Sequence, residues 1–160
     1  MYRGNIRGDD FIETVVQIKR VSKKTKGGNR IRFSALVVVG DKKGKVGVGL
    51  SKAPDVAGAI QKAIKKARGS LKTIPMRDST IPYFVEAKFS AARVLLKPAP
   101  AGSGLIAGGS IRVVLEAMGV RDAVGKIKGT KNKASNVYAT LKALELISEI
   151  SRRKKIVKGK

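Results

Sequence analysis

The amino-acid sequence predicts an α+β protein built from two small modules, in the order β-β-β-α and then β-β-α-β-α. Segments with apolar residues at every second position, as in half-buried strands, occur between segments with the helical period. Residues 69–82, which contain Gly69, Pro75 and Pro82 and show no clear period, separate the two halves. The expected divisions are an amino-terminal extension at 1–10, a first module at 11–74, a second module at 75–150 and a basic tail at 151–160.

Three strands open the first module. Residues 11–21 are rich in β-branched side chains, and residues 31–39 alternate in the same way. The turn signal at 40–44 is followed by residues 46–50, in which Val and Leu alternate with Gly. These segments predict an antiparallel meander. The side chains expected to share faces are Ile12, Val16 and Ile18 in the first strand and Ile31, Phe33, Ala35, Val37 and Val39 in the second.

A helix over residues 54–68 completes this module, because Pro54 suits a first helical turn. Its apolar residues share one face, which should pack on the sheet, and they are Val56, Ala59, Ile60, Ala63, Ile64 and Ala67. The opposite face is basic and contains Gln61, Lys62, Lys65 and Arg68. A short edge strand is expected near residues 71–74.

The second module begins with paired strands at 83–89 and 92–97, followed by a loop at 98–104. Ser110 is expected to cap a helix that runs through Met118, with Gly119 as its stop signal.

Residues 120–128 predict the last strand, and Asn132 the cap of a final helix that ends near Ile150. The tail 151–160 holds six Lys or Arg and no acidic residue, so we expect it to be disordered without a partner.

The charge of the chain is its strongest functional signal. There are 35 Lys and Arg against 11 Asp and Glu, a formal net charge of +24. Such an excess repels itself unless a polyanion relieves it, and nucleic acid, an anionic membrane or an acidic sugar would serve. The chain has no Cys and no His, which excludes Cys/His zinc sites, disulfides and His-dependent triads. No apolar run approaches a membrane span, so a cytoplasmic protein is expected.

The strongest candidate site is the first hairpin, because no acidic residue occurs between Glu13 and Asp41. Its centre, Gly27-Gly28-Asn29, permits a tight reversal with positive φ. We therefore expect a thin basic finger that projects from the sheet and neutralises RNA phosphates. The candidate RNA-binding residues of this hairpin are Lys19, Arg20, Lys23, Lys24, Lys26, Gly27, Gly28 and Arg30.

Two further features bear on the kind of RNA contact. Lys62 and Lys65 lie on the exposed face of the helix 54–68, where they resemble the last helix of double-stranded RNA-binding domains. A sheet that stacks single-stranded bases would need aromatic residues on its central strands, but residues 43–50 carry Val there. We therefore expect recognition of shape and backbone rather than of base sequence.

The glycine-rich segment 102–109 follows a strand, opens a helix and has Asp122 twenty residues after Gly102, as in a dinucleotide-binding fingerprint. We reject that interpretation because Pro98 and Pro100 would disrupt the tight turn and the chain is too short for such an enzyme. Two alternatives stay open: free N–H groups at this helix start hold an RNA phosphate, or the glycines admit the backbone of another protein.

Two other function classes compete with RNA binding. A nucleotide-binding enzyme would use residues 102–109 and would bind free nucleotide. A membrane-associated protein would bind acidic vesicles in the presence of RNA, but no amphipathic helix with a Trp or Phe face supports it. No pair of carboxylates is placed for acid–base work, so we expect neither an enzyme nor a cofactor nor a metal site.

In these motifs the chain resembles a known family, the bacterial form of small-subunit ribosomal protein five. The likeness covers nearly all of residues 9–148. The stretches that carry it are 20–30, 33–41, 44–49, 53–56, 59–63, 96–104 and 106–120, which include the sequences KGGNR, GKVGVG, KPAPAGSG and IAGGSIRVVLEAMGV. One departure is that the last helix opens with Asn132-Lys133 where the family has Asn-Pro, which loses the fixed φ of proline.

The resemblance implies a first module like a double-stranded RNA-binding domain and a second module with a left-handed β-α-β crossover, against the usual rule. It also implies a structural role in the small ribosomal subunit, with ribosomal RNA as the main partner and the hairpin around residues 20–30 directed towards that RNA. Proteins four and eight would be neighbours, and the contact with protein four, which affects decoding accuracy, would involve Gly102, Gly104, Gly108, Gly109 and Arg112. With proteins three and four, the family lines the messenger RNA entry channel.

Overall fold

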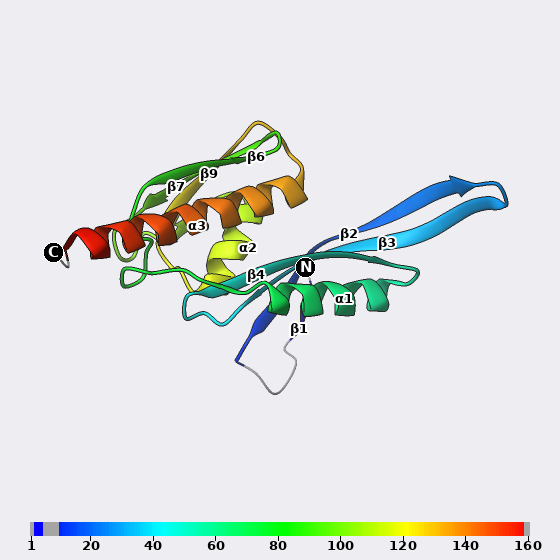
Figure 1. Cartoon of the computed structure of the whole chain (residues 1–160), viewed down its shortest axis with the longest axis horizontal. Helices are drawn as coiled ribbons and strands as arrows, with labels where there is room; N and C mark the ends of the chain where they lie inside the picture. The colour runs from blue at the N-terminus through cyan, green and yellow to red at the C-terminus, as the bar shows by residue number, and fades with distance from the viewer. Residues whose placement is uncertain (1, 5–9, 159–160) are drawn as a thin grey trace.

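The computed structural model describes residues 2–4 and 10–158 and contains two sheets (Figure 1). The first is antiparallel, in the order β1-β2-β3-β4-β5. Its strands are β1 (Tyr2–Gly4), β2 (Ile12–Thr25), β3 (Gly28–Gly40), β4 (Lys45–Ala53) and β5 (Lys72–Thr73). The predicted meander is confirmed as β2, β3 and β4, and the predicted edge strand is β5. Strand β1, which pairs with β2, was not predicted.

The second sheet has the order β6-β7-β9-β8. Its strands are β6 (Val85–Phe89), β7 (Ala92–Pro98), β8 (Leu105–Ile106) and β9 (Ala123–Lys128). The two-residue strand β8 was not predicted, and it pairs with β9 in parallel. A helix connects β8 to β9, so the module contains a β-α-β crossover; its left-handed sense stays a prediction.

Three helices pack between and beside these sheets, namely α1 (Val56–Gly69), α2 (Gly109–Met118) and α3 (Lys133–Lys158). Helix α1 covers one face of the first sheet, while α2 packs against β2, β3 and β4 on the opposite face (Figure 1). Helix α3 packs on α2 and on β6 and β7. The α+β class and the two modules are therefore confirmed.

The inner part of the first sheet is buried on both faces. On the α1 side, Ala35, Val37 and Val39 pack with Ala59 and other alanines of the helix, as the sequence predicts. On the α2 side, β3 and β4 contribute to a core that also contains α2, α3 and the second sheet. The strand side chains in this shared core are Leu36, Val38, Val46 and Val48. The two modules thus fold around one continuous apolar layer.

A β-bulge corrects the predicted face of β2. The register shifts between Val15 and Gln17, so Val16 is an extra residue in the strand. Ile18 is paired with Ala35 and lies on the α1 side, whereas Val16 packs against the shared core on the α2 side. The prediction that Val16 and Ile18 share a face was wrong, because a strict period of two cannot anticipate an inserted residue.

Glycines in β4 let α1 approach the sheet closely. A Cβ atom on Gly47 would lie 2.2 Å from the carbonyl oxygen of Ala67, and one on Gly49 would lie 2.0 Å from that of Ala63. Real side chains do not tolerate such distances to backbone atoms. The alternation of glycine with valine in this strand is therefore explained by helix packing.

We expect Gly49→Ala to destabilise the protein strongly, because the added methyl group would force α1 away from the sheet. Overpacking of this kind costs about 1–3 kcal/mol, and a collision with rigid backbone is at the upper end. Urea unfolding followed by circular dichroism would measure it. Gly69→Ala is the control, since a Cβ there meets no atom within 4 Å. Equal stabilities of the two variants would contradict the packing argument.

Two of the predicted helix starts were wrong. Helix α1 is capped by Asp55, whose Oδ2 accepts from the Gly58 N–H at 2.8 Å, so Pro54 precedes the cap. Helix α2 begins after Gly108 and has no side-chain cap, whereas Ser110 is buried inside its first turn. The predicted stop at Gly119 is confirmed by its left-handed φ of 98°.

The last helix begins as predicted but ends later. The Asn132 side chain accepts from the Ala134 N–H at 3.1 Å, which confirms it as the cap. The helix continues to Lys158, beyond the expected end near Ile150. The expected disorder of residues 151–158 is therefore wrong; residues 159–160 lie outside the described part of the chain. One reason is that Lys154 packs its ammonium group 4.1 Å from the centroid of the Tyr83 ring.

Candidate nucleic-acid interface

The β2–β3 hairpin extends far beyond the rest of the first sheet (Figure 1). Strand β4 pairs with β3 only as far as Phe33, so the outer part of the hairpin is a two-stranded ribbon. We call residues 19–32 the finger. All of its residues are exposed except Val21, which is half-buried. The predicted projecting basic hairpin is therefore present.

The tip of the finger reverses between Thr25 and Gly28, which face each other in the ladder. Gly28 has a φ of 124°, a conformation that side chains rarely adopt, and the Thr25 hydroxyl donates to the Gly28 carbonyl at 2.8 Å. Lys26 and Gly27 are the two residues of the turn. Gly27 does not have positive φ, so only Gly28 meets the predicted requirement for glycine.

The two faces of the finger differ in chemistry. Residues that face each other in an antiparallel ladder point to the same side of the sheet. Lys23 pairs with Arg30, and Val21 with Arg32, on the side that carries Leu36 and faces α2. Lys19, which pairs with Ser34, belongs to the same alternation, so this side carries four cations beside Val21. Its four cations are Lys19, Lys23, Arg30 and Arg32.

The other side of the finger, which faces α1, is mixed. Arg20 pairs with Phe33 and Lys24 with Asn29. Between these cations lies Ile31, which pairs with Ser22 and is 40% exposed, and at the base of the finger lies Ile18, which is 42% exposed. The bulge at Val16 decides this division, because without it Lys19 and Lys23 would point to the α1 side. Arg32 is a further candidate RNA contact, which the predicted set of site residues did not include.

Helix α1 presents Lys62 and Lys65 to solvent, as predicted. Arg68, which was expected on the same exposed face, instead turns towards the sheet. Its Nη2 donates to the Glu13 Oε1 at 2.8 Å and its Nε to the same oxygen at 3.1 Å. Glu13 is only 4% exposed, so Arg68 is part of the structure of the module rather than of its RNA surface.

The glycine loop of the second module is organised by Asp122. The Gly102 N–H and the Gly104 N–H donate to the Asp122 Oδ1 at 3.1 and 2.9 Å, and the Ser79 hydroxyl donates to Oδ2 at 2.5 Å. Both glycines have positive φ, at 90° and 75°. The spacing of Asp122 from Gly102 thus reflects a loop anchor, which supports the rejection of a dinucleotide site.

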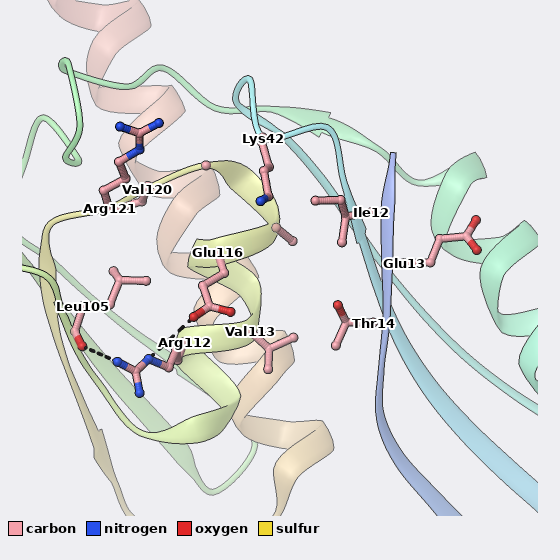
Figure 2. Close-up of a pocket in the computed structure, with 12 residues that line it drawn as sticks. Ile12, Glu13, Thr14, Lys42, Leu105, Arg112, Val113, Glu116, Val120 and Arg121 are labelled. Carbon is pink, nitrogen blue, oxygen red and sulfur yellow. Dashed lines mark hydrogen bonds and ion pairs between the residues drawn. The ribbon is translucent and has the colours of Figure 1, made fainter. Parts of the chain in front are cut away.

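Arg112 lies at the edge of a cavity of about 690 Å³ between the start of β2 and helix α2 (Figure 2). Its guanidinium group donates to the Leu105 carbonyl at 3.0 Å and lies 3.7 Å from the Glu116 carboxylate. Gly108 and Gly109 are exposed at the other end of the loop, and Ile106 is 61% exposed. The predicted loop residues therefore form an exposed surface, to which Gly102 and Gly104 contribute through a fixed backbone.

The sequence matches two known families of protein domains. "Ribosomal protein S5, N-terminal domain" matches residues 11–75, and "Ribosomal protein S5, C-terminal domain" matches residues 87–156. Together the two matches span most of the sequence. The chain belongs to the ribosomal protein S5 family.

Relatives named small ribosomal subunit protein uS5 agree with this assignment. The protein of Treponema denticola is 44% identical over 94% of the chain and 86% of its own length. That of Campylobacter jejuni is 48% identical over 87% of the chain and 95% of its own length. The chain spans 47% of the uS5c protein of Spinacia oleracea, at 50% identity over 89% of the chain, and 60% of the uS5 protein of Mycoplasmopsis agalactiae.

Membership of the S5 family confirms the resemblance seen in the sequence motifs. It also identifies the chain as a member of a family of ribosomal proteins. In residues 2–4 and 10–158, no helix is long and apolar enough to cross a membrane, and no cluster of three or more acidic residues could hold a metal ion.

The role of Asp122 in this S5 protein was missed by reasoning from the sequence. Its hydrogen bonds, first that from Ser79 and then that from Gly104, hold the pKa of its carboxyl group below the ordinary value of 3.8. The carboxylate accepts these hydrogen bonds only in the folded protein. The stability that ionised Asp122 contributes to the fold is therefore complete above the unfolded-state pKa, and it is lost as the pH falls through the lower folded-state pKa.

We therefore expect Asp122→Asn to be less stable than the parent protein at neutral pH, with a gap that narrows as the pH falls below about 4. Urea unfolding at a series of pH values, followed by circular dichroism, would measure the gap. Asp78→Asn is a suitable control, because Asp78 is exposed. A gap for Asp122→Asn that does not change with pH would show that its charge does not stabilise the loop.

Proposed function

We propose that this S5 protein is a structural constituent of the small ribosomal subunit, in the cytoplasm, that binds ribosomal RNA through its finger. The observation that carries the proposal is the exposed ribbon 19–32, which has cations on both faces and no acidic residue. Phosphate groups are the partner that such a surface fits, because each Lys or Arg neutralises one phosphate and releases a counterion. Lys26 at the tip extends the same charge to the end of the finger.

Lys62 and Lys65 on α1 form a second basic surface of the first module. They lie on the face of the helix opposite to the buried Ala59, Ala63 and Ala67, so they are free to contact a further RNA segment. The finger and α1 would thereby hold two RNA elements in a fixed relation. The rigid packing of α1 on β4 supports this function, since it sets the distance between the two surfaces.

The glycine loop supports a finer proposal, that of a protein contact. The surface consists of the exposed Gly102, Gly108, Gly109 and Arg112 and the half-buried Gly104, and Asp122 fixes its backbone at Gly102 and Gly104. We assign it to the contact with small-subunit protein four, and we place protein eight among the other neighbours. In this arrangement the protein stabilises the relative position of the head and the body of the small ribosomal subunit. It also contributes to decoding accuracy and, together with protein three, to the messenger RNA entry channel.

The experiment that tests the RNA function is a titration of the purified chain against folded small-subunit ribosomal RNA, with an equal mass of random duplex RNA as competitor. It is repeated at several salt concentrations. If about six cations contact phosphates, log K should fall with log salt at a slope of about −4 to −5. Tight binding that survives the competitor supports the proposal, and equal, weak binding to both RNAs would contradict a dedicated site.

A further inference from the structure

In the part of the chain that the structure describes, no helix covers one face of the second sheet. The sheet packs on α2 and α3, and both helices lie on the same side of it (Figure 1). The strand side chains on that side, such as Val94 and Leu96 of β7, are buried in the shared core. Since side chains alternate between the two faces of a strand, the residues between them point outwards. We call the central part of this surface the outer face, and it consists of Lys88, Arg93, Leu95, Val124, Lys126 and Lys128.

Three cations of the outer face stand in one row across the sheet. Lys88 of β6 faces Arg93 of β7, which in turn faces Lys128 of β9. All three side chains are exposed, and within residues 2–4 and 10–158 none of them forms an ion pair. Residues directly opposed on antiparallel strands have Cβ atoms about 4.5–5.5 Å apart, and like charges at that distance destabilise the sheet. The row is therefore unfavourable in the free protein and suits a negatively charged partner.

Aliphatic side chains lie beside this row. Leu95 and Val124 are half-buried, although they point away from the core, and Ile106, which pairs with Val124, is 61% exposed. Lys126 pairs with Leu95, and Lys97 pairs with Val124, so each of these two aliphatic residues has a cation as its neighbour. Apolar side chains surrounded by charged ones match the composition of a protein–protein interface, which has an apolar centre and a polar rim.

The chemistry of the outer face distinguishes between possible partners. RNA bound through its phosphates would pair with the cations but would leave Leu95 and Val124 without an apolar contact. Stacking of unpaired bases needs aromatic side chains, and the strand positions of the outer face are aliphatic or charged. A second copy of the chain, with its net charge of +24, would be repelled. A protein segment that carries both carboxylates and apolar side chains complements the whole surface.

We propose that the outer face docks an acidic segment of another protein. Its carboxylates pair with Lys88, Arg93 and Lys128, and its apolar side chains cover Leu95 and Val124. The inference rests on the proposed function, because the partner would be a neighbour in the small ribosomal subunit. It adds a protein contact in which the charge of a sheet, and not a fixed glycine backbone, selects the partner.

The repulsion within the row is tested on the free protein. Arg93→Gln removes the central charge and should raise the melting temperature at low salt by about 1–4 °C, an increase that high salt should abolish. Lys97→Gln is the control, because it removes another cation of β7 whose neighbour on β9 is the uncharged Val124. A melting temperature of Arg93→Gln no higher than that of Lys97→Gln would show that the row does not destabilise the fold, and would overturn the need for an acidic partner.

The partner is tested in reconstituted small ribosomal subunits. Because the chain contains no cysteine, Leu95→Cys gives a single attachment point for a benzophenone cross-linker at the centre of the outer face. After irradiation, we expect a cross-link to a protein segment that is rich in Asp and Glu, which mass spectrometry of the linked peptide identifies.

A second set of variants tests the role of charge in this cross-link. Replacement of the three cations of the row with glutamine, in the Leu95→Cys chain, should lower the yield about tenfold, because up to three ion pairs are lost. An equal loss of charge outside the outer face should leave the yield unchanged. The exposed residues replaced with glutamine in this control are Lys131, Lys133 and Lys142.

The results that would overturn the proposal are distinct from those that bear on the proposed function. A cross-link to ribosomal RNA, or to a protein segment without carboxylates, would overturn it. So would equal yields from the two triple variants, or subunits that contain the labelled protein but give no cross-link. Failure of the parent protein to enter the subunits would instead contradict the proposed function.

Discussion

Replacement of the four cations on the α2 side of the finger with glutamine is expected to reduce RNA binding more than an equal loss of charge elsewhere on the surface. The residues are Lys19, Lys23, Arg30 and Arg32. Each lost phosphate contact removes about 0.7–0.9 from the slope of log K against log salt, so the slope should become shallower by about 3. If the two proteins bind equally near 1 M salt, the affinity at 0.15 M should fall by about two to three orders of magnitude.

The control for this variant is an equal loss of charge in the second module. Lys88, Lys97, Lys126 and Lys142 are exposed and lie on β6, β7, β9 and α3, outside the finger. Their replacement lowers the net charge by the same amount but should change the slope far less. If both sets reduce it equally, the charge acts as a general attraction for polyanions, and the finger is not a dedicated RNA site.

Arg68→Ala is expected to destabilise the fold by about 3–5 kcal/mol, the usual cost of leaving a buried charge unpaired. The Glu13 side chain is 5% exposed and would lose its guanidinium partner, whereas Arg68 is 34% exposed. The same guanidinium group lies 5.9 Å from the centroid of the Phe11 ring. Removal of the Arg68 side chain therefore also removes a packing contact at the edge of the core. Urea unfolding would measure the loss.

Two further variants identify the cause of this loss. Glu13→Gln should cost less than Arg68→Ala, because a neutral amide is less unfavourable in a buried position than an unpaired carboxylate. Lys62→Ala, at an exposed position of the same helix, should change stability by less than about 0.5 kcal/mol. An effect of Arg68→Ala as small as that of Lys62→Ala would show that the buried pair does not hold β2 to α1.

The sequence was sufficient for the features that depend on local pattern. The alternation in residues 31–39 and the alanine face of α1 predicted the core on one side of the first sheet, and the single sign of charge in the hairpin predicted the finger. The faces of the finger could not be predicted, because the bulge at Val16 arises from the fit of β2 against two different layers. A period of two continued through that point places Lys19 and Lys23 on the wrong side.

Other features depend on contacts between distant residues. Asp122 was noticed only for its spacing from Gly102, and nothing local indicates that it accepts hydrogen bonds from two glycines and from Ser79. The exposed position expected for Arg68 was wrong for the same reason, since its partner Glu13 lies 55 residues away. The helical tail was missed because a run of Lys and Arg favours disorder until a partner such as Tyr83 is in place.

The central claim, that the finger lies against ribosomal RNA, can be tested directly because the chain contains no cysteine. Lys26→Cys gives a single attachment point at the tip of the finger for an iron chelate that cleaves nearby RNA. Glu86→Cys, at an exposed position of β6, provides the comparison. In reconstituted small subunits that contain either variant, we expect strong cleavage at a few defined ribosomal RNA positions from residue 26 and a different, weaker pattern from residue 86. Incorporation of the Lys26→Cys protein without cleavage near its tip would contradict the claim.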